Sequence, residues 1–192
     1  GTCHDELWDP TPYVGAYVRY FVPHPTTQLM PRKVKTAFTA SDADRAITGI
    51  HDIAFIPRIR DGVEGVDTRV GGGTSILPRV APTLYEFVEL ANGDYLKVSE
   101  AVFRIFDRQD WLRVNRARAR IKVLIDKIGI DEFRDQVEEE LKGDWVEQRD
   151  SVTGEWPGLD VIWYSLGTWA RCRSLLPTLE VLTESALSDR AW

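Results

Sequence analysis

The sequence has few of the residues that hold metals and disulfides: its 192 residues include three histidines and two cysteines, Cys3 and Cys172. The cysteines lie far apart and match neither a disulfide framework nor the spacing of a zinc or iron–sulfur motif. His4 stands beside Cys3, but no further ligand accompanies them. We therefore expect a cytoplasmic protein with no metal site made by its own residues.

Long apolar runs and an excess of positive charge are missing as well. No stretch approaches the roughly 18 apolar residues that would span a membrane, and no secretory signal opens the chain. The formal net charge of −6 argues against a surface made for nucleic acid. We therefore expect neither a membrane nor a nucleic-acid partner, and a chain of this length can form one domain with a real core.

Hydrophobic periodicity predicts both helices and strands. Helical spacing predicts helices over residues 13–21, 41–47, 84–90, 95–108, 114–128 and 131–142. Runs rich in β-branched residues predict strands over residues 32–38, 50–59 and 66–70. The expected fold class is α+β, a mixed β-sheet flanked by helices.

The character of the sequence changes after Gly143, and we place the domain boundary near residue 149. The tail, residues 150–192, holds four tryptophans separated by glycines and no motif that carries chemistry. A docking segment, a partly disordered tail and a non-native, out-of-frame extension are all compatible with it.

Two lysines in the first expected strand form a candidate anion site. Side chains at i and i+2 of a strand share a face, so Lys33 and Lys35 point the same way. Two ammonium groups about 4 Å apart repel each other by about 1 kcal/mol in water, and an anion between them removes that repulsion. An exposed edge strand protected by lysines is the simpler interpretation, and spacing alone leaves both open.

The glycine run Gly71, Gly72 and Gly73 follows a predicted strand. Glycines allow a backbone to approach something flat or bulky, although a plain loop explains them too. The run fits neither a P-loop nor a dinucleotide fingerprint.

Arginines gather at the start of the helix expected over residues 114–128. Arg113, Arg116 and Arg120 follow i, i+3, i+7 and would form one stripe on that helix. Arginine suits carboxylates because its guanidinium binds them with two parallel bonds, while a solvated helix face is the alternative. A nucleic-acid patch is less well supported, because no aromatic residues are interleaved for stacking.

Four segments together resemble one family, the sirohaem-dependent nitrite and sulfite reductases. Residues 30–35 (MPRKVK) resemble its LPRKFK signature, and residues 50–56 (IHDIAFI) resemble IHDIGFI with alanine in place of glycine. Residues 70–73 (VGGG) and 115–122 (NRARARIK) resemble two further signatures. The order and spacing of all four fit, and the resemblance covers about residues 8–149.

The resemblance implies a six-electron reduction of nitrite to ammonia or of sulfite to sulfide, with ferredoxin as the expected electron donor. Lys33 and Lys35 match the lysines that contact the substrate anion and help to deliver protons. Arg32, the glycines 71–73, Arg116 and Arg120 lie in segments that line the sirohaem and its carboxylates. The cofactors implied are sirohaem and a [4Fe–4S] cluster.

The sequence also departs from the family. The cluster cysteines come in two spaced pairs in the family, and this chain has no such pairs. We therefore expect an interior piece of a reductase, resembling the first of its two repeats, with the cluster ligands outside this chain and no turnover by the piece alone. The rival hypothesis is a non-catalytic anion-binding or protein-interaction module whose basic residues meet an acidic partner.

Overall fold

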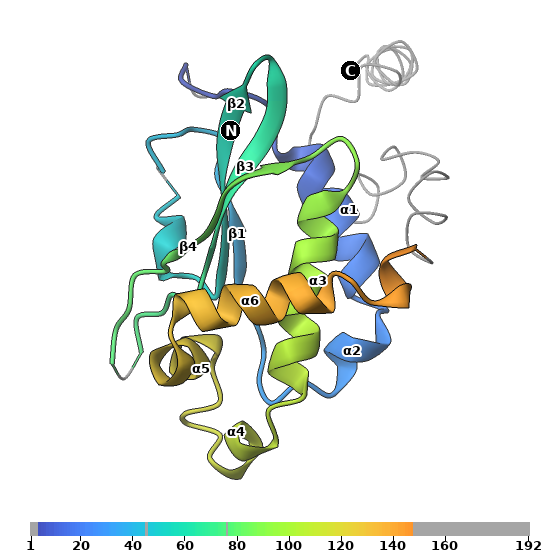
Figure 1. Cartoon of the computed structure of the whole chain (residues 1–192). Coiled ribbons are helices and arrows are strands. Elements are labelled where there is room, and N and C mark those ends of the chain that lie inside the picture. Colours follow the sequence, from blue (N-terminus) through green and yellow to red (C-terminus); the bar gives the residue numbers. More distant parts are fainter. Residues whose placement is uncertain (1–3, 45, 76, 148–192) are drawn as a thin grey trace, which may run out of the picture. The chain divides into compact units, whose positions relative to one another are not determined.

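A mixed four-stranded sheet organises the part of the chain that the computed structural model describes, residues 4–44, 46–75 and 77–147. Its order is β1 (Thr36–Phe38), β2 (Ile53–Arg60), β3 (Val63–Val70) and β4 (Thr83–Glu89). Strand β1 pairs with β2 in parallel, and the other two pairs are antiparallel. The expected α+β fold with a mixed sheet is therefore confirmed (Figure 1).

A tight turn joins β2 to β3. Asp61 and Gly62 have φ values of 53° and 80°, the left-handed backbone that a two-residue hairpin turn requires. The turn fixes a register in which Ile53 faces Val70 and Arg60 faces Val63. Because the side-chain period of a strand is two, this register places Phe55 and Val66 in the core.

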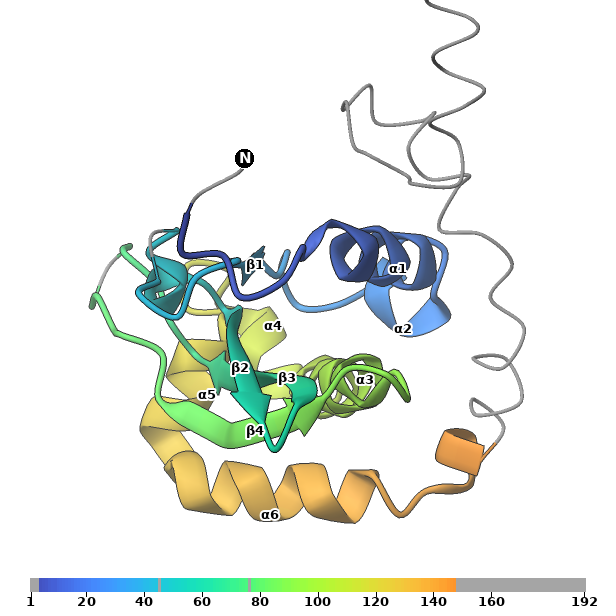
Figure 2. The ribbon, with the colours of Figure 1, turned by 90° about the horizontal axis from the view of Figure 1, so that it is seen from above.

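Six α-helices and one 3₁₀ helix accompany the sheet among the described residues. They are α1 (Thr11–Phe21), α2 (Pro25–Gln28), η1 (Thr48–Ile50), α3 (Asp94–Asp107), α4 (Asp110–Val114), α5 (Ile121–Ile128) and α6 (Ile130–Glu140). Figures 1 and 2 show α1 and α3 beside the sheet and α6 running across α3. No helix in these ranges is long and apolar enough to cross a membrane.

Aromatic side chains fill the space between α1, α3 and the sheet. The Tyr17 ring packs on Phe21, Phe38, Phe55 and Phe103 at centroid separations of 4.5–6.5 Å. Its hydroxyl and that of Thr36 are 2.9 Å apart, which satisfies a polar group inside this cluster. Burial raises the pKa of Tyr17 far above its ordinary value.

Helix α6 closes the opposite side of the core. Phe133 and Val137, one turn apart, have no exposed surface. Gly129, with φ of +86°, separates α6 from α5. Arg134 donates to the main-chain oxygens of Thr83 and Leu84, so α6 is attached to the start of β4.

Two predicted helices are wrong. Residues 84–90, expected to be helical, belong largely to β4, where Leu84 and Val88 are buried and Val88 pairs with Val66. A short apolar run does not distinguish a strand from a helix by periodicity. The short helix over residues 41–47 does not form, because Asp44 and Ile47 take φ values of 47° and 51°, which interrupt a right-handed helix.

Two other elements are shorter than expected. The strand predicted over residues 32–38 is paired only from Thr36 to Phe38. The helix predicted over residues 114–128 forms only over α5, Ile121–Ile128, because residues 115–120 form a turn, and Val114 is the last residue of the separate helix α4. The predicted tail, residues 150–192, lies outside the described residues.

Candidate functional site

One buried carboxylate joins the segments that the sequence singled out. Asp52, just before β2, has 1% of its surface exposed. Its Oδ1 accepts from Nε of Arg120 at 2.9 Å, and its Oδ2 accepts from Nη2 of Arg120 at 2.6 Å. Oδ2 also accepts from the main-chain nitrogen of Lys35 at 2.8 Å. Residues far apart in sequence therefore meet at this side chain.

The main chain at Asp52 holds the glycine run. The nitrogen of Gly71 donates to the oxygen of Asp52 at 2.8 Å, and that of Gly72 donates to the oxygen of His51 at 2.9 Å. The lysine segment, the glycine run and Arg120 thus share one neighbourhood, near the end of the sheet where α5 lies (Figure 1).

Lys33 and Lys35 are both exposed, and Val34 between them packs against the core. This alternation is the one that the sequence predicted, although the two lysines precede the paired part of β1. The Lys35 oxygen accepts from the nitrogen of Ile53 at 3.1 Å. Neither ammonium group forms a hydrogen bond or ion pair within the described ranges, so both are available to an anion.

Arg32 brings a further arginine to the lysine segment. Its Nη1 donates to the main-chain oxygen of Arg116 at 2.5 Å, so the turn of residues 115–120 lies beside the lysines. The Arg116 side chain is exposed and has no hydrogen-bonding or acidic partner among the residues described. Arg116 is therefore free to bind an anionic group, whereas Arg32 is partly engaged.

The arginine stripe predicted on one helix does not exist. Arg113 is on α4, Arg116 is in the turn, and Arg120 directly precedes α5. Arg113 donates to the oxygen of Leu29 at 2.5 Å and to the Asp107 carboxylate at 2.7 Å. Since the chain turns at residues 115–120, the three side chains do not share one face.

The glycine run is buried, and its missing side chains make room for the protein itself. A Cβ on Gly72 would lie 2.3 Å from the oxygen of Gly49 and 2.4 Å from that of His51. Gly71 has φ of +85°, and a Cβ there would lie 2.6 Å from Cδ1 of Ile125. The close approach that the sequence predicted therefore includes the chain's own backbone.

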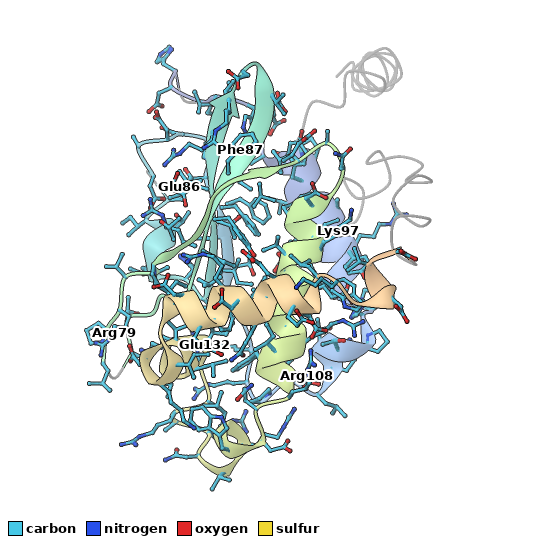
Figure 3. The ribbon with its side chains drawn as sticks, in the orientation of Figure 1. Arg79, Glu86, Phe87, Lys97, Arg108 and Glu132 are labelled. Atoms are coloured by element: carbon cyan, nitrogen blue, oxygen red, sulfur yellow. The ribbon has the colours of Figure 1, made fainter. Side chains whose placement is uncertain are left out.

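Lys122, a residue that sequence reasoning did not select, supports the loop after the glycine run. It is 4% exposed, and its Nζ donates to the oxygens of Leu77 and Ser75 at 3.0 and 3.4 Å. Burial, and then the nearby Arg120 guanidinium, lower the pKa of Lys122. Arg79 in the same loop pairs with Asp126 of α5 at 2.9 Å. Figure 3 shows Arg79, which precedes β4, well away from Glu86 and Phe87 of that strand.

The exposed cations fit some parts of a sirohaem site and not others. Lys33, Lys35 and Arg116 suit a small oxyanion or the carboxylates of a macrocycle. Among the described residues no group of three or more histidine, cysteine or acidic side chains could hold a metal ion, and Cys3 lies outside those residues. The chain thus offers contacts to anionic groups and no described ligand for an iron or a cluster.

Comparison with known proteins identifies the family. Residues 1–144 match the family described as "Nitrite and sulphite reductase 4Fe-4S domain". The "Sulfite reductase [ferredoxin] 1" of Mycolicibacterium paratuberculosis is 36% identical over 146 residues, 73% of this chain and 24% of the relative. The "Sulfite reductase [NADPH] hemoprotein beta-component" of Methylorubrum extorquens is 35% identical over 122 residues, 58% of this chain and 19% of the relative.

A solved structure shares the fold. The NirA protein of Mycobacterium tuberculosis aligns with a TM-score of 0.64 and 36% identity, covering 74% of this chain and 26% of that one. The chain therefore spans about a quarter of the length of the Mycolicibacterium paratuberculosis relative and of the NirA chain. By the match over residues 1–144, this chain belongs to the nitrite and sulphite reductase 4Fe-4S domain family.

Proposed function

We propose that this chain supplies the anion-binding side of a sirohaem reductase that reduces sulfite to sulfide or nitrite to ammonia. In this role Lys33 and Lys35 bind the substrate oxyanion, and Arg116 and Arg32 contact the carboxylates of the macrocycle. The glycine run would complete the wall of the cofactor pocket and Arg120 would support it. The observation that carries the proposal is the meeting of the lysine segment, the glycine run and Arg120 at Asp52.

Charge explains how the lysine pair would act. The two ammonium groups have no acidic partner within the described residues, so an oxyanion between them gains attraction to both and removes their mutual repulsion. When bound, the sirohaem and its cluster would carry the electrons of the reduction from the donor to the substrate. An ammonium beside the substrate can donate a proton as an S–O or N–O bond breaks, and exposure lets solvent return that proton.

The relatives favour sulfite over nitrite as the substrate. Those named above are a ferredoxin-dependent and an NADPH-dependent sulfite reductase, and the two differ in their electron donor. We infer ferredoxin as the donor, since the ferredoxin-type relative matches over 146 residues and the NADPH-type relative over 122. We also expect no turnover by the chain alone, because cluster ligands are absent from its described residues.

An absorption titration of the purified chain with sirohaem tests the proposal. Saturable binding is expected, and Arg116→Ala should weaken it by about tenfold, which corresponds to about 1.4 kcal/mol. The double variant Lys33→Ala/Lys35→Ala should leave sirohaem binding nearly unchanged and abolish the effect of added sulfite on the spectrum. No saturable binding by the unaltered chain would refute the cofactor-binding part.

A matched control separates site charges from total charge. Arg108→Ala/Lys142→Ala also removes two positive charges, but these side chains pair with Glu140 and Glu139 near the end of α6. This variant should bind sirohaem and respond to sulfite like the unaltered chain. If both double variants lose the spectral response to sulfite equally, the attraction is non-specific, and a general anion-binding module is favoured.

A further inference from the structure

We propose that Asp52 is the positioning residue of the anion-binding face, fixing the lysine segment, Arg120 and the glycine run relative to one another. The inference rests on the proposed function, because it assigns a structural support to the same site. It gives Asp52 no direct contact with substrate or cofactor, since 1% of its surface is exposed. Its effect on ligands would pass through the groups that it holds.

The hydrogen bonds of Asp52 occupy both oxygens of its carboxylate. Arg120 uses Nε and Nη2 in a two-bond arrangement, at 2.9 and 2.6 Å, which is the strongest geometry for this pair of groups. That edge of the guanidinium is therefore taken by Asp52. We accordingly assign Arg120 as a support and leave direct contact with the macrocycle to Arg116, whose side chain is exposed.

Asp52 also continues the pairing of β1 and β2 by one residue. The two strands pair from Thr36 with Ile53 onward. The main-chain oxygen of Asp52 does not take part in this pairing, because it accepts from the nitrogen of Gly71. Its side chain accepts from the nitrogen of Lys35, while Ile53 donates to the oxygen of Lys35. The main-chain nitrogen and oxygen of Lys35, just before β1, are thus both hydrogen-bonded.

Holding this backbone matters because lysine side chains are long and carry much rotational freedom. Two ammonium groups can bind one small anion only if their stems begin on the same face at a fixed separation. Val34 packs against the core on the other face, and Asp52 prevents the segment from rotating about its axis. Loss of the carboxylate should therefore spread the two lysines and release Arg120.

The chain contains a matched control in Asp67 of β3. It is 5% exposed and, like Asp52, is bonded by arginine, from Arg58 at 3.1 Å and Arg69 at 2.9 Å. Asp67 faces Ile56 in the sheet register, and in the part of the chain that the structure describes its carboxylate bonds to arginines and not to the lysine segment or the glycine run. Asp67→Asn therefore removes a buried, arginine-bonded charge without touching the proposed site.

The experiment compares the unaltered chain with Asp52→Asn and Asp67→Asn, each shown to be folded by circular dichroism. Sirohaem affinity, followed by absorption, should fall by about tenfold or more in Asp52→Asn, as for supporting residues of ligand sites. It should change by less than about twofold in Asp67→Asn, as for a substitution remote from a site. Equal losses in the two variants, or an unchanged affinity in Asp52→Asn, would overturn the positioning role.

Amide hydrogen exchange gives a second readout that needs no cofactor. Exchange at Lys35 and Gly71 should accelerate by about tenfold or more in Asp52→Asn and stay near the original rate in Asp67→Asn. If the unaltered chain does not bind sirohaem, the proposed function fails, and exchange alone decides whether Asp52 positions these segments. If Asp52→Asn does not fold, Arg120→Lys takes its place in both measurements. A loss of sirohaem affinity with faster exchange would support the positioning role, and no change in either would overturn it.

Discussion

Replacement of Gly72 by alanine tests what the glycine run is for. The new Cβ would lie 2.3 Å from the oxygen of Gly49, 2.4 Å from the oxygen of His51 and 2.9 Å from the nitrogen of His51. All three are main-chain atoms, so no side chain can rotate away. Overpacking of this kind costs about 3 kcal/mol, and loss of the bond from Gly72 to His51 adds about 1 kcal/mol.

A total loss near 4 kcal/mol is a large part of the roughly 5–15 kcal/mol that stabilises a typical domain. The melting temperature should fall by about 8–16 °C, at about 2–4 °C per kcal/mol for a chain of this size. Urea unfolding followed by circular dichroism measures the free energy directly.

Gly62→Ala is the control for this measurement. A Cβ on Gly62 would meet nothing within 4 Å, and its φ of +80° limits the expected cost to the left-handed strain of about 1–2 kcal/mol. If Gly72→Ala costs no more than Gly62→Ala, the run is loosely packed and our account of it is wrong. A loss of unfolding free energy near 4 kcal/mol in Gly72→Ala would mean that the close packing of the glycine run holds the Asp52 segment in place.

Three further outcomes follow from the same structure. Phe133→Ala should lower the unfolding free energy by about 3–5 kcal/mol in urea titration, because the ring has no exposed surface; a loss below about 1 kcal/mol would contradict its place in the core. Lys33→Ala/Lys35→Ala should change stability by less than about 0.5 kcal/mol, since both side chains are exposed, and a larger loss would reveal a structural role. Burial raises the pKa of Tyr13 and Tyr85 from 10.0 to about 12. Their neutral forms therefore contribute stability that is complete below pH 10 and is lost as the pH rises through 12; a near-ultraviolet titration should show these two tyrosines ionising late, and a single transition near pH 10 would disagree.

The sequence predicted the parts of the fold whose pattern is long and regular. Helices α1, α3 and α6 appear close to their expected residues, as do β2 and β3. Long periodic segments repeat the same signal several times, so one irregular residue does not hide it. The Asp61-Gly62 pair is typical of the tight turn that the structure has there, because few dipeptides accept left-handed backbone.

The failures have physical causes that lie outside the local pattern. Residues 84–90 read as a helix, yet pairing with β3 decides their structure, and that partner is distant in sequence. The arginine stripe failed because residues 115–120 turn, so Arg120 points to a buried carboxylate and Arg116 to solvent. The role of Asp52 could not be predicted for a similar reason. An aspartate that follows a histidine has no distinctive pattern, and its partners Lys35 and Arg120 are distant in sequence.

The parallel pairing of β1 with β2 has a consequence for folding order. Strands β2 and β3 pair over eight residues across a two-residue turn, so their contacts close a short loop and can form early. The lysine segment instead depends on three paired residues of an edge strand and on Asp52. We expect this face to assemble last and to open first in the native state, as the least cooperative unit of the domain. A ligand bound between Lys33 and Lys35 would then slow the opening of that unit while leaving the exchange of the β2–β3 hairpin unchanged.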